Sequence, residues 1–453
     1  MGLAVIVLAA GEGKRMRSDL PKVLHLLAGR PIISHVIELA QNLSELPPIV
    51  VTGYHGDDIR AKFPSENITW VDQKERLGTG HAVAQALKHI SKEDTVVVLY
   101  GDVPLLRVET LMKMVGSLGL SELSFLTSKV TDPSGYGRIL RDSAGKFVGI
   151  VEDQDATEKQ LLISETNTGI AVASCSALAQ MVPLLAADNS QKEYYLTDCA
   201  KLARDLKISV GTHELIDSSE AFGINDQVQR AQAERIYQRR NAISLMRSGV
   251  TISDPDRIDV RGNIKCGKNV SIDVNSVFEG SVILGDNVRI GPNCLITDSI
   301  VGKGSEIFGS CVINGAKIGE NALVGPFAHL RPGTHLENTV KVGNFVEIKN
   351  SNLGAGSKTG HLSYVGDSEV GKNANLGAGT ITCNYDGANK HKTVIGDDAF
   401  IGSGSILVAP VSIGENATTA AGTTITKDVA KGDLALRRGQ QKSIPGWQRP
   451  RKK

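Results

Sequence analysis

The second half of the chain, from about residue 272 to 425, repeats an aliphatic residue every six positions, and glycine often follows it. Ile318-Gly319, Val324-Gly325 and Leu330 begin one such run. A period of six fits neither an α-helix nor an alternating strand. It is typical of a parallel β-helix in which each hexapeptide supplies a short strand and a turn.

We expect three hexapeptides to close one triangular coil, with the aliphatic side chains inside and the following glycines supplying the backbone geometry of the corners. At about 4.8 Å between neighbouring strands, the pattern predicts roughly nine or ten coils. The register breaks over about 383–394, so a loop should leave the solenoid there. Such loops often form binding surfaces. The flat sides of a β-helix are usually covered by self-association.

The first half alternates between apolar runs and amphipathic segments. The pattern predicts strands over Ala4–Ala9, Pro48–Thr52 and Thr95–Leu99, and helices over Pro31–Gln41 and Gly80–His89. Ala4–Ala9 is apolar throughout, as expected for a central strand that is covered on both faces of a sheet. This alternation predicts an open α/β domain.

The segment between the two halves, Asn225–Arg247, carries apolar residues at helical spacing, and Gly249 follows it. It predicts one linker helix about 30 Å long. We therefore expect an α/β domain over 1–225, a linker helix over 226–248, and a β-helix domain with a basic tail over 249–453.

Composition narrows the class of protein. A length of 453 residues suits two or more domains, and a net charge of +1 gives no indication of a nucleic-acid or anionic-membrane partner. No apolar run approaches the roughly 18 residues of a membrane span. The six cysteines show no C-x-x-C spacing, which favours reduced thiols in the cytoplasm. The apolar start, Met1–Gly11, has no basic residues before it and is a buried strand rather than a signal peptide.

A glycine loop that carries cations follows the first predicted strand. The run Leu8–Met16 lacks the third glycine of the dinucleotide fingerprint and is not a Walker A loop. Arg15 and the nearby Lys22 favour a nucleoside triphosphate, although a glycine turn with solvated cations is the structural alternative. Asp102 follows another strand, where it can hold Mg²⁺ against phosphate oxygens or cap a helix.

His361 takes an outward turn position in the β-helix, where the coil does not need histidine. Arg331 and Lys349 are separated by one coil and should stack as a cationic pair, which makes a phosphate site beside a base. An outward histidine is more often simply solvated. A zinc site formed with His329 and His335 is disfavoured, because the three histidines fall on different faces or coils.

The motifs of both halves are similar to those of known transferases. The N-terminal motifs are, in order, 8–16 (LAAGEGKRM), 20–24 (LPKVL), 73 with 77–81 (Q, LGTGH), 100–102 (YGD), 135–138 (GYGR), 149–152 (GIVE), 167–169 (NTG) and 193–198 (EYYLTD). They resemble sugar-nucleotide pyrophosphorylases. With the hexapeptide half, nearly the whole chain resembles the bacterial bifunctional N-acetylglucosamine-1-phosphate uridylyltransferase and glucosamine-1-phosphate acetyltransferase family. The resemblance implies an α/β nucleotidyltransferase domain with a Rossmann-like mixed sheet, followed by a left-handed parallel β-helix of hexapeptide repeats.

The resemblance implies two reactions. The C-terminal half would acetylate glucosamine 1-phosphate with acetyl-CoA, and the N-terminal half would then transfer UMP from UTP to the product with Mg²⁺, releasing pyrophosphate. The resulting UDP-N-acetylglucosamine would feed peptidoglycan and lipopolysaccharide synthesis. The family implies a cytoplasmic homotrimer joined through the β-helix, with acetylation sites between subunits and no nucleic-acid or membrane partner. Two alternatives are a pyrophosphorylase with a structural or regulatory β-helix and a non-catalytic scaffold.

The resemblance also implies site residues. In the uridylyl site, Arg15 and Lys22 would act on the phosphates, and Asp102 and Asn225 would bind the metal. The other nucleotide and sugar contacts would be Leu8, Ala9, Ala10, Gly11, Gln73, Gly78, Thr79, Tyr100, Gly101, Gly137, Glu152, Asn167, Tyr195 and Thr197.

In the acetyl site, His361 would be the base. Glucosamine 1-phosphate would be bound by Arg331, Lys349, Tyr364, Asn375 and Lys390. Acetyl-CoA would be bound by Ala378, Asn384, Tyr385, Ser403, Ala421 and Arg438. Of these residues, Asn384 and Tyr385 would orient the amine.

Overall fold

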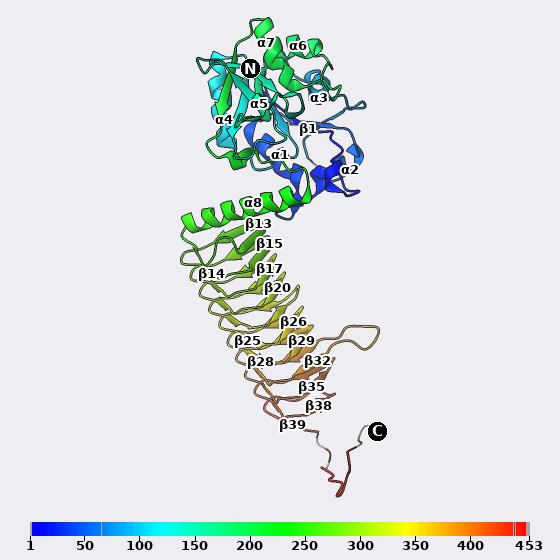
Figure 1. The fold of residues 1–453 in the computed structure, drawn as a ribbon. Coiled ribbons are helices and arrows are strands. Elements are labelled where there is room, and N and C mark those ends of the chain that lie inside the picture. The colour runs from blue at the N-terminus through cyan, green and yellow to red at the C-terminus, as the bar shows by residue number, and fades with distance from the viewer. Residues whose placement is uncertain (1, 65, 438, 440, 450–453) are drawn as a thin grey trace. The chain divides into compact units, whose positions relative to one another are not determined.

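A computed structural model describes residues 2–64, 66–437, 439 and 441–449, and Figure 1 draws the fold as a ribbon. The chain divides into two compact units, residues 1–237 and 238–453. Within the described residues, no helix combines the length and the apolar character that crossing a membrane requires.

The N-terminal unit is built on a mixed sheet with the strand order β11-β7-β10-β6-β1-β4-β5. Its main strands are β1 (Leu3–Ala9), β4 (Ile49–Thr52), β5 (Thr69–Asp72), β6 (Thr95–Tyr100), β7 (Leu123–Lys129), β8 (Arg138–Arg141), β9 (Phe147–Val151), β10 (Glu165–Ser174) and β11 (Val210–Glu214). Its helices are α1 (Ile32–Leu43), α2 (Gly56–Arg60), α3 (Thr79–Leu87), α4 (Val108–Ser117), α5 (Glu158–Leu161), α6 (Cys175–Met181) and α7 (Cys199–Asp205).

The central strand β1 is buried on both faces, as its uninterrupted apolar run predicts. Val5 and Val7 pack into one hydrophobic cluster, whereas Ile6 and Leu8 pack into another on the opposite face. β1 pairs in parallel with β4 and β6, so the carboxyl ends of these strands meet at one edge of the sheet. The predicted α/β architecture is confirmed, and ligands of such sheets lie at this edge.

The C-terminal unit is a parallel β-helix with three faces. The first face contains β12 (Thr251–Ile252), β14 (Ser271–Ile272), β16 (Arg289–Ile290), β19 (Glu306–Ile307), β22 (Leu323–Val324), β25 (Lys341–Asn344), β28 (Lys358–His361), β31 (Asn375–Leu376), β34 (Phe400–Ile401), β37 (Thr418–Thr419) and β39 (Leu434–Ala435). The second face contains β13 (Ile258–Cys266), β15 (Ser276–Leu284), β17 (Leu295–Thr297), β20 (Val312–Asn314), β23 (His329–Leu330), β26 (Glu347–Lys349), β29 (Tyr364–Gly366), β32 (Ile381–Cys383), β35 (Ile406–Val408) and β38 (Thr424–Ile425).

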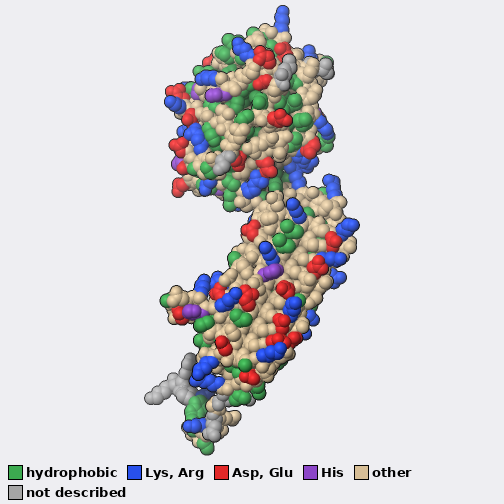
Figure 2. Space-filling view, turned by 180° about the vertical axis from the view of Figure 1, so that it is seen from behind, with side chains coloured by type: hydrophobic (Ala, Val, Ile, Leu, Met, Phe, Trp, Pro, Cys, Tyr) green, Lys and Arg blue, Asp and Glu red, His purple; other side chains and the backbone are tan. Residues whose placement is uncertain are grey.

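The third face begins at the ends of the long strands β13 and β15. It continues through β18 (Ile300–Val301), β21 (Lys317–Ile318), β24 (His335–Leu336), β27 (Asn352–Leu353), β30 (Ser368–Val370), β33 (Thr393–Ile395) and β36 (Val411–Ile413). Within the described residues, the three faces hold 11, 10 and 9 strands, with the extra strands at the ends of the solenoid. The predicted nine or ten coils are therefore confirmed. On the face that Figure 2 shows, cationic and anionic side chains are interspersed along this unit.

The glycines after the inward aliphatic residues serve a purpose that we did not predict. Most of them avoid the left-handed backbone region, and a Cβ on Gly402 would lie 2.5 Å from the backbone nitrogen of Ala421 in the next coil. Glycine is needed there because successive coils approach closely. The left-handed position comes two residues later, as at Asn321 (φ 54°) and Asn373 (φ 54°), and asparagine tolerates it well.

Helix α8 (Gln227–Arg247) follows the α/β sheet. It begins two residues later than predicted, because Asp226 caps it by accepting a hydrogen bond from the backbone nitrogen of Gln229 at 2.8 Å. In its C-terminal part, Gln238 exchanges two hydrogen bonds with the backbone of Val260, and Ala242 packs into the β-helix core. This part of α8 therefore covers the first coil. The functional division at 225 and 248 remains a prediction.

Candidate active sites

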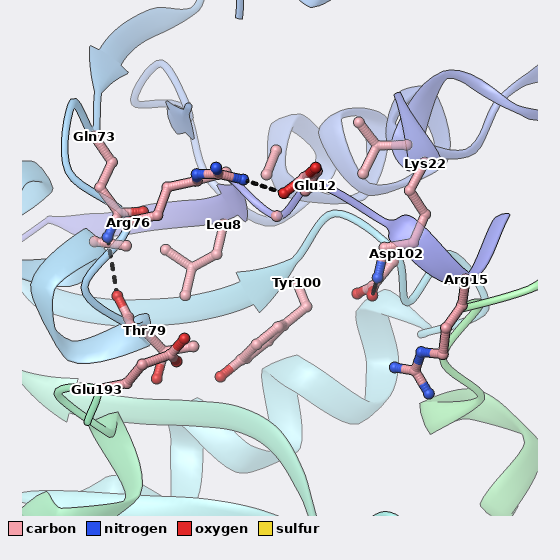
Figure 3. Close-up of a pocket in the computed structure, with 16 residues that line it drawn as sticks. Leu8, Glu12, Arg15, Lys22, Gln73, Arg76, Thr79, Tyr100, Asp102 and Glu193 are labelled. Atoms are coloured by element: carbon pink, nitrogen blue, oxygen red, sulfur yellow. Dashed lines mark hydrogen bonds and ion pairs between the residues drawn. The ribbon is translucent and has the colours of Figure 1, made fainter. Parts of the chain in front are cut away.

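A cavity of about 510 Å³ opens at the carboxyl ends of β1 and β6 (Figure 3). Its lining residues are Leu8, Ala9, Ala10, Gly11, Glu12, Arg15, Lys22, Val23, Gln73, Arg76, Gly78, Thr79, Ala82, Tyr100, Asp102 and Glu193. The fold thus brings together the glycine loop, the 73–79 segment and the end of β6, which are far apart in sequence. This is the nucleotide cavity.

A second cavity of about 660 Å³ adjoins the first and shares Arg15, Thr79, Tyr100 and Glu193 with it. The residues predicted to contact the sugar all line it, namely Gly137, Glu152, Asn167, Tyr195 and Thr197. This is the sugar cavity. The remaining two predicted residues, Gly101 and Asn225, are not in the lining of either cavity. Gly101 instead donates a backbone hydrogen bond to the Leu8 carbonyl at 2.9 Å, joining the ends of β6 and β1.

Two cationic side chains and two side-chain oxygens that can bind a metal form a cluster at the edge of the nucleotide cavity. The Lys22 ammonium forms an ion pair with Asp102 and donates to Asn225 Oδ1 at 3.2 Å, and Arg15 donates to the same oxygen at 3.0 Å. The side chains of Lys22 and Asp102 are only 13% and 17% exposed. The oxygens of Asp102 and Asn225 therefore converge on one position, which the Lys22 ammonium takes in this structure.

This donor set suits Mg²⁺. One carboxylate and one amide oxygen are too few to hold Mg²⁺ alone, but this ion commonly takes its other ligands from phosphates and water. Within the described residues, no group of three or more His, Cys, Asp and Glu side chains is placed to hold a metal. Asp102 and Asn225 thus fit a metal that arrives with a triphosphate.

The sugar cavity offers buried hydrogen-bond acceptors. Thr197 Oγ1 donates to Glu152 Oε1 at 2.7 Å. Burial raises the pKa of Glu152, although the Thr197 hydrogen bond opposes this shift. Asn167 Oδ1 is buried and has no hydrogen-bond partner among the described residues. An orphaned buried oxygen is costly, so this atom fits a ligand that donates to it.

Tyr100 lies between the two cavities and lines both. Burial raises the pKa of the Tyr100 phenol, so the ring remains neutral. Gly169 (φ 84°) allows the ring to lie there, because a Cβ on this residue would come within 2.7 Å of the Tyr100 ring. Burial likewise raises the pKa of Tyr195 to about 12. Both phenols are therefore neutral hydrogen-bonding groups at the cavity surface.

Sequence reasoning missed several lining residues of these cavities. Arg76 Nη1 forms an ion pair with Glu12 at 2.8 Å, so the 73–79 segment and the glycine loop are joined beside the cavity. Glu193 and Tyr136 were also not singled out, although they line the cavities. Glu12, Tyr136 and Glu193 lie inside the recognised motifs, so assigning whole motifs rather than single positions would have found them.

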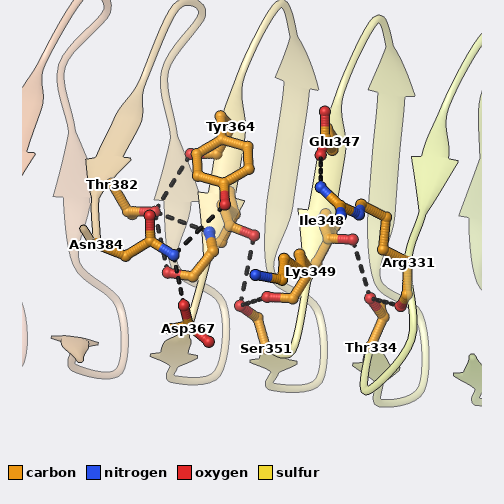
Figure 4. A network of polar contacts seen from close by, with 12 residues as sticks. Arg331, Thr334, Glu347, Ile348, Lys349, Ser351, Tyr364, Asp367, Thr382 and Asn384 are labelled. Atoms are coloured by element: carbon orange, nitrogen blue, oxygen red, sulfur yellow. Dashed lines mark hydrogen bonds and ion pairs between the residues drawn. The ribbon is translucent and has the colours of Figure 1, made fainter. Parts of the chain in front are cut away.

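On the second face of the β-helix, Arg331 and Lys349 take equivalent positions on adjacent coils, because Leu330 pairs with Ile348 (Figure 4). They stack as expected, but Arg331 Nη1 also binds Glu347 Oε1 at 2.7 Å, so an anionic side chain joins the pair. Lys349 instead lies close enough to Lys390 to lower the pKa of that ammonium. Two neighbouring ammonium groups fit an anion such as a phosphate.

Asp367 and Asn384 complete this group of side chains. Asn384 Nδ2 donates to Asp367 Oδ2 and, at 3.4 Å, to the Tyr364 hydroxyl. Burial would raise the pKa of Asp367, but hydrogen bonds from Asn350 and Asn384 and the charge of Lys349 together lower it.

The coil after Lys349 has 17 residues, so Lys349 stacks on Gly366. A coil of three full hexapeptides would have placed residue 367 there.

His361 lies at an exposed corner between the first and second faces. Its Nδ1 is 2.6 Å from Oδ1 of Asn344, the residue with which it pairs in the preceding coil. An amide oxygen only accepts hydrogen bonds, so Nδ1 carries the proton. The Nε2 lone pair is left free to act as a base. Sequence reasoning missed Asn344, although coil spacing would have placed it beside His361.

Below His361, the same corner position is taken by small residues, Ala378, Ser403 and Ala421, which we call the small-residue column. Hydrogen bonds connect this corner from coil to coil, including Gly404 nitrogen to the Ala378 carbonyl at 2.7 Å and Gly422 nitrogen to the Ser403 carbonyl at 2.8 Å. The next position along each of these coils is glycine: Gly379, Gly404 and Gly422. A strip with little side-chain bulk therefore begins beside His361, and a long, thin ligand would fit it.

The other predicted residues of the acetyl site come from the loop that leaves the solenoid and from the first face. Tyr385 and Lys390 pair across a hairpin in the loop between β32 and β33, which leaves the solenoid in Figure 1. Asn375 lies on the first face, in register with Lys358, and is not brought beside Arg331 and Lys349. Arg438 lies outside the described residues.

Both halves of the chain match known families. Residues 5–143 match the MobA-like NTP transferase domain. Residues 263–298, 315–350 and 392–427 match the family described as bacterial transferase hexapeptide (six repeats). The predicted nucleotidyltransferase domain and hexapeptide β-helix are confirmed.

Full-length relatives carry both halves together. The chain is 51% identical over 450 residues to "Bifunctional protein GlmU" of Marinobacter nauticus, covering 99% of each chain. It is 50% identical to the proteins of the same name from Ralstonia nicotianae (98% of each chain) and Stutzerimonas stutzeri (100% of each chain). The resemblance seen in the sequence is confirmed, and the chain belongs to the GlmU family of bifunctional transferases.

Proposed function

We propose that the chain makes UDP-N-acetylglucosamine in two steps. The β-helix acetylates glucosamine 1-phosphate with acetyl-CoA, and the α/β unit then transfers UMP from UTP to N-acetylglucosamine 1-phosphate. The observation that carries this proposal is the presence of two separate sites of different chemistry. One is a pair of adjoining cavities, beside which lie cationic side chains and the oxygens of Asp102 and Asn225 that could bind a metal. The other is an oriented histidine above the small-residue column.

In uridylyl transfer, a phosphate oxygen of the sugar 1-phosphate attacks the α-phosphorus of UTP in line. The new P–O bond forms as the bond from the α-phosphorus to the bridging oxygen breaks, and pyrophosphate leaves. Such reactions depend on positioning and on charge stabilisation. Arg15, which lines both cavities, and Lys22, which lines the nucleotide cavity, supply positive charge. When bound by Asp102 and Asn225, Mg²⁺ would add further positive charge against the triphosphate.

In acetyl transfer, the amine nitrogen of glucosamine 1-phosphate attacks the thioester carbonyl of acetyl-CoA. As the C–N bond forms, His361 Nε2 accepts the proton that the nitrogen loses, and the C–S bond breaks. The imidazolium then returns this proton to the departing thiolate, so CoA leaves as the thiol. Arg331, Lys349 and Lys390 hold the phosphate. The small-residue column and the glycines beside it accommodate the acetyl-CoA arm.

We propose further that the acetylating form is a cytoplasmic homotrimer joined through the β-helix. Phe327, Phe345 and Leu362 take left-handed backbone positions at the His361 corner and are 52%, 56% and 64% exposed. The two phenylalanine rings stack with their centroids 5.2 Å apart. Bulky apolar residues in such positions are unusual and fit contact with another copy. Asn375, on another face, would then serve the site of a neighbouring subunit.

The proposal is tested by measuring both reactions on the same samples of the intact chain, His361→Ala and Asp102→Ala. We expect His361→Ala to lose thiol release from acetyl-CoA and to retain pyrophosphate release from UTP. Asp102→Ala should show the opposite pattern, so each variant is the folding control for the other. If the intact chain releases pyrophosphate but no thiol, the β-helix is structural and the acetyl half of the proposal is wrong.

A further inference from the structure

The orientation of the Gln73 side chain in the nucleotide cavity is fixed by its neighbours. Gln73 is only 4% exposed, and its Nε2 lies 3.0 Å from the Gly78 carbonyl oxygen and 3.0 Å from His81 Nδ1. A carbonyl oxygen cannot donate, so the NH₂ group and not Oε1 must face Gly78. Oε1 is then the amide atom that remains for a base in the cavity.

His81 supplies the second acceptor for this NH₂ group. Nδ1 can accept only when it is unprotonated, so the proton of the neutral ring lies on Nε2. Gln85, one turn further along α3, has its carboxamide 3.0 Å from His81 Nε2. The Gln85 atom nearest the ring is Nε2, and Oε1 accepts from the exposed Lys88 ammonium at 3.0 Å. A ring nitrogen that carries the proton needs an acceptor, so we infer that the carboxamide turns over, with its oxygen toward His81 and Lys88 released to solvent. The order Gln85, His81, Gln73 and Gly78 is then a chain in which every hydrogen bond has one donor and one acceptor.

We infer that His81 is a positioning residue for base recognition: it holds Gln73 with its oxygen toward the base, so that the site selects uracil over cytosine. This inference rests on the proposed use of UTP. Uracil presents N3–H, which Gln73 Oε1 can accept, whereas cytosine presents an unprotonated N3. Oε1 and cytosine N3 would face each other as two acceptors, and a buried unpaired polar group is strongly disfavoured.

Without the acceptor at His81, the Gln73 carboxamide loses one of the two partners that fix it. It can then turn its NH₂ group toward cytosine N3, at the cost of its contact with Gly78. His81 thus affects selectivity without touching the substrate. Its removal should change the ratio of UTP to CTP use rather than the overall rate alone.

The test compares His81→Leu with His81→Asn in the full-length chain. The leucine removes the acceptor, whereas the asparagine can place an oxygen close to the position of Nδ1. Pyrophosphate release with N-acetylglucosamine 1-phosphate gives kcat and KM for UTP and for CTP. Thiol release by the β-helix is measured on the same samples as a folding control.

We expect the UTP-to-CTP ratio of kcat/KM to fall about tenfold in His81→Leu, the size of one misplaced hydrogen bond, mainly through the KM for UTP. His81→Asn should retain most of the selectivity. An unchanged ratio in His81→Leu, or an equal loss in both variants, would overturn the inference. A parent chain that does not favour UTP would instead contradict the proposed function.

Discussion

At the scale of single residues, the sugar cavity contains a carboxyl group whose burial serves ligand binding but lowers the stability of the fold. Glu152 is a buried acceptor beside Thr197, and burial raises its pKa. The folded chain therefore holds the Glu152 proton more tightly than the unfolded chain does. Between the unfolded and folded pKa values, stability falls as pH rises, because the carboxylate is ionised in a poorly solvated position. Active sites commonly carry such costs.

We therefore expect Glu152→Gln to raise the thermal midpoint of the N-terminal unit at pH 7 while it weakens binding of the sugar phosphate. The stability gain should disappear below about pH 4, where the carboxyl is protonated in both states. Calorimetry at both pH values, with the KM for N-acetylglucosamine 1-phosphate, checks this. A variant that is less stable than the parent at pH 7 would show that Glu152 is not strained by burial.

Asn344 is a second case in which one atom sets the chemistry of another residue. Because Oδ1 of Asn344 fixes the proton on His361 Nδ1, Asn344→Ala should lower kcat for acetyl transfer by about tenfold or more, since general-base catalysis depends on the position of the base. Asn344→Asp retains an acceptor and should lose less. Thiol-release kinetics of both variants decide this, and similar losses in both would mean that the acceptor does not matter.

The sequence indicated individual residues well where a motif or the coil spacing constrained them. The residues predicted for the nucleotide and sugar cavities converge, except that Gly101 and Asn225 lie just outside the lining. Counting 18 residues per coil fails at Lys349, because the coil that follows it has 17 residues, as do several others. The ion pair between Arg331 and Glu347 was also missed, since it joins two outward positions that no sequence period marks.

At the scale of elements, the loop between β32 and β33 is an ordered hairpin. Asp386 accepts hydrogen bonds from the backbone nitrogens of Asn389 at 2.7 Å and Ala388 at 2.8 Å, and from His391 at 2.6 Å. These hydrogen bonds, from the Asn389 backbone first and then from His391 and the Ala388 backbone, lower the pKa of the Asp386 carboxyl. The sequence showed only that the hexapeptide register stops here. The internal bonds of the hairpin follow from side chains that no period encodes.

This hairpin carries Lys390, so we expect Asp386→Ala to raise the KM for glucosamine 1-phosphate severalfold by loosening the turn that places the ammonium beside Lys349. The KM for UTP should not change. Steady-state kinetics with both substrates check this, and Lys390→Ala is the reference for complete loss of the ammonium. An unchanged KM in Asp386→Ala would show that the turn does not position Lys390.

The β-helix strands were predictable because one inward aliphatic residue per face repeats along the solenoid. The role of the glycines was not, because a period marks where glycine occurs but not what surrounds it. At Gly402 the neighbouring backbone excludes a Cβ, and the left-handed conformation is found two residues later. The coils also stack closely at the corner below His361, where the small-residue column of Ala378, Ser403 and Ala421 lies.

At the scale of the whole molecule, the corner that carries His361 also carries a group of exposed apolar side chains. If Phe327, Phe345 and Leu362 are covered by another copy, assembly and acetylation depend on the same surface. Uridylyl transfer uses cavities that lie wholly within residues 1–237. The two activities should therefore respond differently to dilution, with only acetylation falling as subunits separate.

Phe345→Glu tests this link, because a charge in place of a half-exposed ring strongly disfavours an apolar contact. We expect the variant to sediment as a smaller species than the parent, to lose at least about tenfold in thiol release at low protein concentration, and to keep its rate of pyrophosphate release. Ile216→Glu is the matched control, since Ile216 is 98% exposed in the N-terminal unit and its replacement should change neither assembly nor rate. A Phe345→Glu chain that sediments like the parent and acetylates normally would show that this corner is free in the active enzyme.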